Sequence, residues 1–181
     1  MALGRDRRQE RREERHGGGA VKYRMRQKLV SIGDDYWIED EAGQRVFKVD
    51  GKALRIRDTL ILEDAGGRKV AKIQEKMLRI KDAMAIEDGD GNRIAMVKKA
   101  LITPLRDRWH VEVENGSDLD VKGNILDHEY EFEDDGHRVA SVSKKWFRVA
   151  DTYGVEIEPG TDPVVVLAAT VALDMMVHED R

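Results

Sequence analysis

One short pattern recurs along the chain at a fixed spacing, and it constrains the fold more than any other feature. An apolar residue, a Glu-Asp pair, a glycine-containing turn and a second apolar run start at Ile38, Leu62 and Ile86, which are 24 residues apart. A shorter copy starts at Phe132, a looser one surrounds Val113, and a truncated "VEIEPG" follows near the end. A fixed period of this size indicates a repeated supersecondary unit.

Each unit has the pattern of a β-hairpin. Apolar residues alternate before the turn, as in Leu60 and Leu62, which predicts a strand with one buried face. We expect Gly43, Gly67 and Gly91 to occupy equivalent turn positions with related backbone angles, because glycine adopts positive φ without strain. Six such units, starting with "VKYRMRQKLVSI", predict about twelve strands.

The C-terminal segment "TDPVVVLAATVALDMMVHEDR" has a different character. Asp162 before Pro163 is typical of a helix start, with a capping side chain followed by proline at the first helical position. No residue from Val164 to Leu173 is charged, so a helix here must be buried on every side. The apolar run is about 14 residues long, shorter than the roughly 20 that cross a bilayer. We predict a buried helix over residues 162–178.

The helix and the strands fit one another. Eight strands make a barrel just filled by side chains, and the diameter grows with strand number. A helix with its side chains is about 10–12 Å across, so about twelve strands leave room for one. We predict a mainly β protein: a closed antiparallel barrel of about twelve strands around a buried C-terminal hydrophobic α-helix. Residues 21–181 would form this single domain, and residues 1–20 a charged, disordered tail with a glycine hinge.

Several segments resemble the LURP-one-related family, within the tubby C-terminal-like superfamily. They are the repeated hairpins, "LDHEYEF", "VSKKWFRVADTYGVEI" and the apolar helix after "PGTDP". The resemblance covers residues 21–181 and implies a twelve-stranded tubby-like barrel around a C-terminal helix. The superfamily includes tubby-type phosphoinositide binders and phospholipid scramblases, whereas the LURP-one-related group has no well-defined activity. The resemblance therefore implies a fold and supplies no catalytic motif.

Motifs that would indicate an enzyme or a metal site are weak. The chain has no cysteine, no serine in a G-x-S-x-G setting and no glycine-rich phosphate loop. "DGDGN", Asp88 to Asn92, imitates the start of a calcium loop, but Arg93 replaces the expected glycine and Lys99 the expected glutamate. We interpret it as a hairpin turn.

The five histidines show no pair at metal-ligand spacing on one element. His128 alternates with Tyr130 and Phe132, and we interpret it as an inward-facing, hydrogen-bonded core residue rather than a catalytic base. We predict no catalytic residue, no metal ion and no cofactor.

Charge is arranged with the same periodicity as the hairpins. If neighbouring strands are antiparallel and connected in order, every Glu-Asp turn lies at one end of the barrel and the alternate connections lie at the other. Those connections are basic. The candidate headgroup-binding residues are Lys52, Arg55, Arg57, Lys76, Arg79, Lys81, Lys144 and Lys145, and the connections also include Lys98, Lys99, Arg106, Arg108 and Arg148.

Two interpretations of this basic rim stay open. The charges could complement the helix dipole, whose negative end emerges among them, and keep the barrel ends soluble. Alternatively, the rim meets anionic lipid headgroups or an acidic partner. The net charge of −4 argues against a general nucleic-acid binder.

We therefore expect a cytoplasmic, non-enzymatic binding or scaffold protein that is peripheral at the membrane. Anionic phospholipid is the first candidate partner. The first alternative is a protein-interaction or structural module without lipid affinity, and the second is an uncharacterised enzyme.

Overall fold

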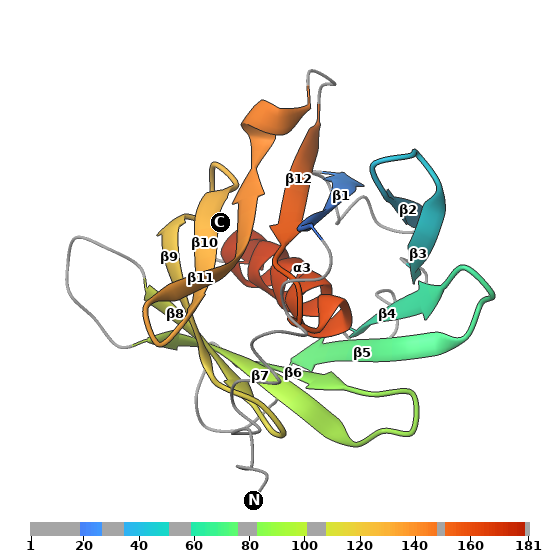
Figure 1. Cartoon of the computed structure of the whole chain (residues 1–181). Helices are drawn as coiled ribbons and strands as arrows, with labels where there is room; N and C mark the ends of the chain where they lie inside the picture. The colour runs from blue at the N-terminus through green and yellow to red at the C-terminus, as the bar shows by residue number, and fades with distance from the viewer. Residues whose placement is uncertain are drawn as a thin grey trace, which may run out of the picture.

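The computed structural model describes residues 19–26, 35–50, 59–75, 83–100, 108–147 and 151–179. In these ranges, twelve strands form one closed antiparallel barrel around the C-terminal helix α3 (Pro163–Glu179) (Figure 1). The predicted fold class is therefore confirmed. The charged segment 1–18, predicted to be a disordered tail, lies outside the described residues.

The strands follow one another around the barrel in chain order. They are β1 (Val21–Arg26), β2 (Tyr36–Glu39), β3 (Arg45–Asp50), β4 (Thr59–Asp64), β5 (Lys69–Glu75), β6 (Ala83–Glu87), β7 (Arg93–Ala100), β8 (Arg108–Val113), β9 (Leu119–Asn124), β10 (Glu129–Asp134), β11 (His137–Ser143) and β12 (Thr152–Ile157). A short 3₁₀ helix, η1 (Lys144–Trp146), follows β11. β1 closes the ring by pairing with β12 along its length and with β2 through Arg24 and Glu39.

This order places the connections alternately at two ends of the barrel. The turns after β2, β4, β6, β8, β10 and β12 lie at one end, which we call the turn end. The C-terminal ends of β1, β3, β5 and β7 lie at the other end, together with the turn 125–128 and η1, and we call it the connection end. Helix α3 enters from the turn end, so its negative C-terminal end points toward the connection end.

The glutamate of each repeated Glu-Asp pair joins its hairpin to the preceding strand. It lies opposite a cation 15 residues earlier, and side-chain nitrogen and oxygen are 3.2–3.5 Å apart. The pairs are Arg24–Glu39, Lys48–Glu63 and Lys72–Glu87. Half-exposed cross-strand pairs contribute at most about 1 kcal/mol each. Their repetition every 24 residues supports one strand register around this part of the barrel.

The aspartate of each pair fixes its own turn. Asp64 Oδ1 accepts hydrogen bonds from the backbone amides of Gly66 and Arg68, at 3.0 and 2.9 Å. Asp88 makes the same contacts with Asp90 and Asn92 in the "DGDGN" segment, which is a hairpin turn as predicted. These hydrogen bonds hold the pKa of both carboxyl groups below the usual value.

The three repeat glycines do occupy equivalent positions. Gly43, Gly67 and Gly91 have φ angles of 75°, 80° and 90°. Each donates its amide to the carbonyl of the aspartate three residues earlier. The prediction of equivalent turn positions for these glycines is confirmed.

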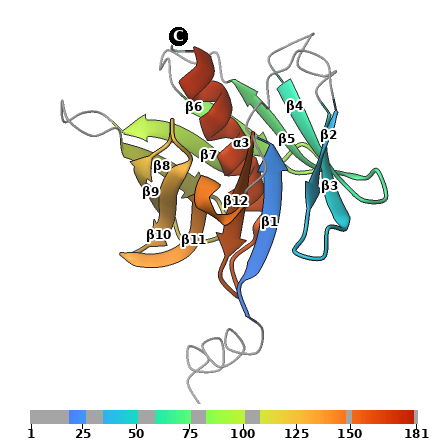
Figure 2. The ribbon, with the colours of Figure 1, turned by 90° about the horizontal axis from the view of Figure 1, so that it is seen from above.

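The core is the space between the barrel wall and α3. The alternating residues before each turn are buried, and every helix residue from Val165 to Met176 is buried as well. Asp162 Oδ1 accepts from the Val164 amide at 2.8 Å, which is the predicted cap. Figure 2 shows α3 running through the ring of strands, where it fills the interior that a wide barrel would otherwise leave empty.

Candidate functional site

The structure describes two of the eight predicted rim cations. Lys144 and Lys145 form the start of η1 at the connection end. The other six, Lys52, Arg55, Arg57, Lys76, Arg79 and Lys81, lie outside the described residues, as do Arg106 and Arg148. The alternation of connections between two ends follows from the strand order, whereas the continuous basic rim stays a prediction.

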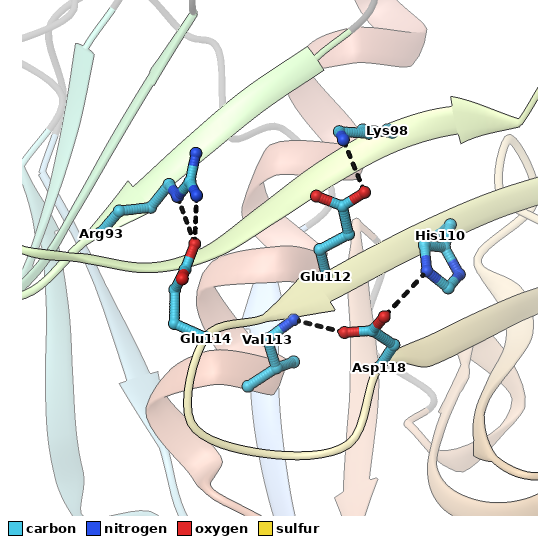
Figure 3. A network of polar contacts seen from close by, with 7 residues as sticks. All are labelled: Arg93, Lys98, His110, Glu112, Val113, Glu114 and Asp118. Atoms are coloured by element: carbon cyan, nitrogen blue, oxygen red, sulfur yellow. Dashed lines mark hydrogen bonds and ion pairs between the residues drawn. The ribbon is translucent and has the colours of Figure 1, made fainter.

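Three other cations do not belong to a connection. Lys98 and Lys99 lie within β7 and Arg108 is the first residue of β8, so grouping them with the connection was wrong. Lys98 pairs with Glu112 of β8 on the barrel wall, beside the Arg93–Glu114 pair (Figure 3). The strand simply continues further than the sequence pattern indicated.

The same network also fixes the next turn. Asp118 accepts a hydrogen bond from the Val113 amide at 2.9 Å, and its other carboxylate oxygen lies 3.5 Å from His110 Nε2 (Figure 3). The charges of this face are therefore largely matched on the wall itself.

The dilysine of η1 is held on a fixed support. Glu129, the first residue of β10, lies opposite Ser143, the last residue of β11. The Glu129 carboxylate accepts from Ser143 Oγ at 3.0 Å and from the Lys144 amide at 3.2 Å. Lys145 Nζ lies 3.4 Å from the same carboxylate and remains largely exposed. The support therefore fixes the backbone of η1 while leaving the Lys145 ammonium open to solvent.

The aromatic residues after the dilysine fold across β12. A Cβ atom at Gly154 would lie 2.6 Å from Trp146 Cε3 and 2.8 Å from Phe147 Cε2, so glycine is required there. Lys22 Nζ lies 5.4 Å from the Trp146 ring centroid, and Arg24 Cζ lies 5.0 Å from that of Phe147. Sequence reasoning noted this motif but missed the contact; the glycine within a predicted strand was the available signal.

A second polar cluster lies inside the barrel. Asp174 of α3 is 2% exposed and accepts a hydrogen bond from the Tyr153 hydroxyl at 2.8 Å. His128 is equally buried, and its Nε2 lies 3.1 Å from the other carboxylate oxygen. The His128 and Tyr153 rings are in contact, with centroids 4.3 Å apart. The cluster therefore ties α3 to β12 and to the turn before β10.

His128 is thus the buried core residue that the sequence indicated, but it belongs to a turn rather than to a strand. The prediction of a hydrogen bond was wrong, because neither ring nitrogen has a partner with hydrogen-bond geometry among the described residues. The His128 φ of 52° is unusual for a residue with a side chain. A His–Asp contact can orient a general base, but here both groups are enclosed between helix and barrel. The arrangement supports a role in seating the helix.

Three tyrosines surround the buried carboxylate. Burial first, and then the charge of Asp174, raise the pKa of Tyr36, Tyr130 and Tyr153 well above the usual value of 10. Each hydroxyl therefore favours its neutral form in the folded state. Their contribution to the free energy of unfolding is fully present below about pH 10, where tyrosine in the unfolded chain is also neutral. It decreases as the pH rises above about 10, because only the unfolded chain then loses the protons.

We expect these tyrosines to ionise only when the barrel unfolds. In an alkaline titration, the tyrosinate absorbance at 295 nm should rise together with loss of the far-ultraviolet circular dichroism signal. Tyr23 is half-buried, and its pKa is raised by partial burial and by Asp40. Replacing Tyr23 by phenylalanine therefore removes the tyrosinate absorbance of the most accessible tyrosine. Full tyrosinate absorbance near pH 10 with an unchanged dichroism spectrum would contradict the arrangement.

Within the described ranges, no cluster of three or more His, Cys, Asp or Glu side chains is arranged to hold a metal ion. No helix in that part of the chain combines the length and apolar character needed to span a bilayer.

Together, these features define the class: a barrel protein whose interior is filled by its own C-terminal helix. A model of the LURP-one-related family matches residues 21–174, so the chain belongs to that family. The uncharacterised protein YxjI of Bacillus subtilis is 28% identical over 157 residues, which cover 87% of this chain and 94% of YxjI.

A solved structure supports the fold. The X-ray structure of a protein from Arabidopsis thaliana aligns with a TM-score of 0.66 and 20% identity. The alignment covers 90% of this chain and 93% of the plant protein. At this identity, the likeness concerns the fold alone.

Proposed function

We propose that the protein is a non-enzymatic binding protein that docks on anionic phospholipid surfaces through the connection end of its barrel. The observation that carries the proposal is the dilysine Lys144–Lys145 at that end, whose backbone is held by Glu129 and whose Lys145 side chain is largely exposed. The segments that join β3 to β4 and β5 to β6 lie outside the described residues, and their sequences contain the other six candidate cations. Family membership and the helix-filled barrel favour a binding module over an enzyme.

The opposite end supports the same orientation. The aspartates Asp40, Asp64 and Asp88 lie at the turn end, where anionic lipid would repel them. Near a negatively charged bilayer, the molecule would therefore turn its connection end toward the surface. Each cation close to such a surface contributes about 1 kcal/mol, and salt screens the attraction beyond roughly 8 Å at physiological ionic strength.

Cosedimentation with vesicles tests the proposal. The wild type should bind phosphatidylcholine vesicles that contain phosphatidylserine, should bind pure phosphatidylcholine poorly, and should dissociate as salt rises. Lys144→Gln/Lys145→Gln should weaken binding roughly 30-fold, because two contributions of about 1 kcal/mol are lost. Replacing all eight candidate cations should abolish it.

A charge-matched control lies at the other end of the barrel. Arg68→Gln/Arg93→Gln removes two cations from the turn end, where they pair with Asp64 and Glu114. This variant should bind vesicles as the wild type does. No preference of the wild type for anionic vesicles, or equal losses in the two double variants, would overturn the proposed orientation and partner.

A further inference from the structure

Two exposed apolar side chains flank the dilysine. Among the described residues, the large apolar side chains with substantial exposure are Val21, Leu126 and Trp146. Leu126 is 51% exposed in the turn before β10, and Trp146 is 36% exposed in η1 after β11. Both are at the connection end. Glu129 at the start of β10 holds the backbone of Lys144, so the two segments are neighbours.

The turn that carries Leu126 is anchored on both sides. Ile125 and His128 are buried, and the His128 amide donates to the Ile125 carbonyl at 3.0 Å. Asp127, the acidic residue of the turn, is hydrogen-bonded through its amide and carboxylate to the Asn124 side chain. The residues on both sides of Leu126 are therefore held in place, whereas Leu126 itself is exposed at the surface.

Trp146 is fixed in a comparable way. One part of its ring lies against Gly154, and the Lys22 ammonium lies over the ring. Trp146 directly follows Lys145 in η1 and remains 36% exposed. Figure 2 shows β12 between β1 and β11. Because Trp146 packs against Gly154 of β12, its ring lies over the barrel wall.

We propose that Leu126 and Trp146 enter the headgroup layer of an anionic bilayer while Lys144 and Lys145 contact its phosphates. This inference rests on the proposed function and adds a defined contact surface, which we call the insertion patch: Leu126, Lys144, Lys145 and Trp146. The barrel then docks tilted toward its β10–β12 side rather than squarely on its end.

The chemistry of the patch fits this partner. Tryptophan has an amphipathic ring that partitions to the level of the headgroups, and leucine gains from leaving water. Cations beside an apolar surface are typical of segments that lie in the interface of anionic membranes. The carboxylates of an acidic protein would pair with the lysines, but this pairing would not remove Leu126 and Trp146 from water.

Tryptophan fluorescence distinguishes insertion from electrostatic contact. The chain has three tryptophans, of which Trp109 is buried and Trp37 is the other partly exposed one. Trp37→Phe keeps Trp146 as a reporter, and Trp146→Phe keeps Trp37 as the matched control. On phosphatidylserine vesicles with brominated acyl chains, emission of Trp37→Phe should be quenched and shifted to the blue. Trp146→Phe should show neither change.

Binding measurements provide the second readout. Leu126→Ser and Trp146→Ala should each weaken partitioning onto the same vesicles about tenfold, because apolar surface no longer leaves water. Leu126→Ser should melt close to the wild-type temperature, since Leu126 is 51% exposed and lies outside the buried core. If the wild type shows no preference for anionic vesicles, the proposed function fails. If the wild type prefers anionic vesicles, but Trp146 is not quenched and Leu126→Ser binds as the wild type does, only the insertion patch is overturned.

Discussion

Ala169→Asp should yield no folded barrel. Ala169 is 0% exposed in α3, where the helix is enclosed by the strands on all sides. A new carboxylate there would be buried without a partner, and the effective penalty is several kcal/mol. A domain of this size is stable by only about 5–15 kcal/mol in total. Soluble yield and the far-ultraviolet circular dichroism of any recovered protein measure the result.

The control is the same substitution at the start of the helix. Val164 is partly buried in the first turn of α3, where a negative charge interacts favourably with the helix dipole. Val164→Asp should therefore fold, with a moderately lower melting temperature. Soluble Ala169→Asp that melts with the wild type would show that this helix is not the core of the domain.

Local patterns predicted most of this fold, because each of its elements repeats a simple rule. The alternation of apolar residues in the hairpins predicted which side chains face inward. The absence of charge from Val164 to Leu173 predicted a helix that is buried on every side. Strand limits were less certain. β7 extends through Lys98 and Lys99, and this moved two cations from the predicted rim to the barrel wall.

The two residues of each Glu-Asp pair have different roles, which the sequence pattern did not distinguish. Sequence reasoning assigned both carboxylates to one acidic end, but adjacent residues have different positions. Glu63 points outward from β4 and is matched by Lys48, whereas Asp64 begins the turn and binds its amides. The aspartates therefore lie at the turn end, whereas the glutamates are matched by cations of the preceding strand.

The buried polar cluster could not be predicted as a contact. The sequence offered two separate signals, a single carboxylate within an apolar segment and a histidine that was predicted to face inward. Whether the Asp174 and His128 side chains are in contact depends on how far α3 extends into the barrel and on the rotation of α3 about its axis. Neither quantity follows from periodicity, because a helix that is apolar all round has no preferred face.

Asp174→Leu should destabilise the protein by about 3–5 kcal/mol, the cost of leaving one member of a buried pair without its partner. His128 would lose the carboxylate that faces its Nε2, and the Tyr153 hydroxyl would lose its acceptor. The added apolar surface offsets only part of this loss, since both polar groups remain enclosed. Urea unfolding followed by circular dichroism gives the free energy.

Two further variants separate the pair from simple packing. Tyr153→Phe removes one hydrogen bond to a charged group and should cost about 1.5–3 kcal/mol. In the double variant Tyr153→Phe/Asp174→Leu, the hydroxyl that Asp174→Leu leaves unpaired is absent, so the total loss should be smaller than the sum of the single losses. Strict additivity would mean that the two side chains act independently, and an unchanged free energy for Asp174→Leu would show that the cluster does not hold α3 in place.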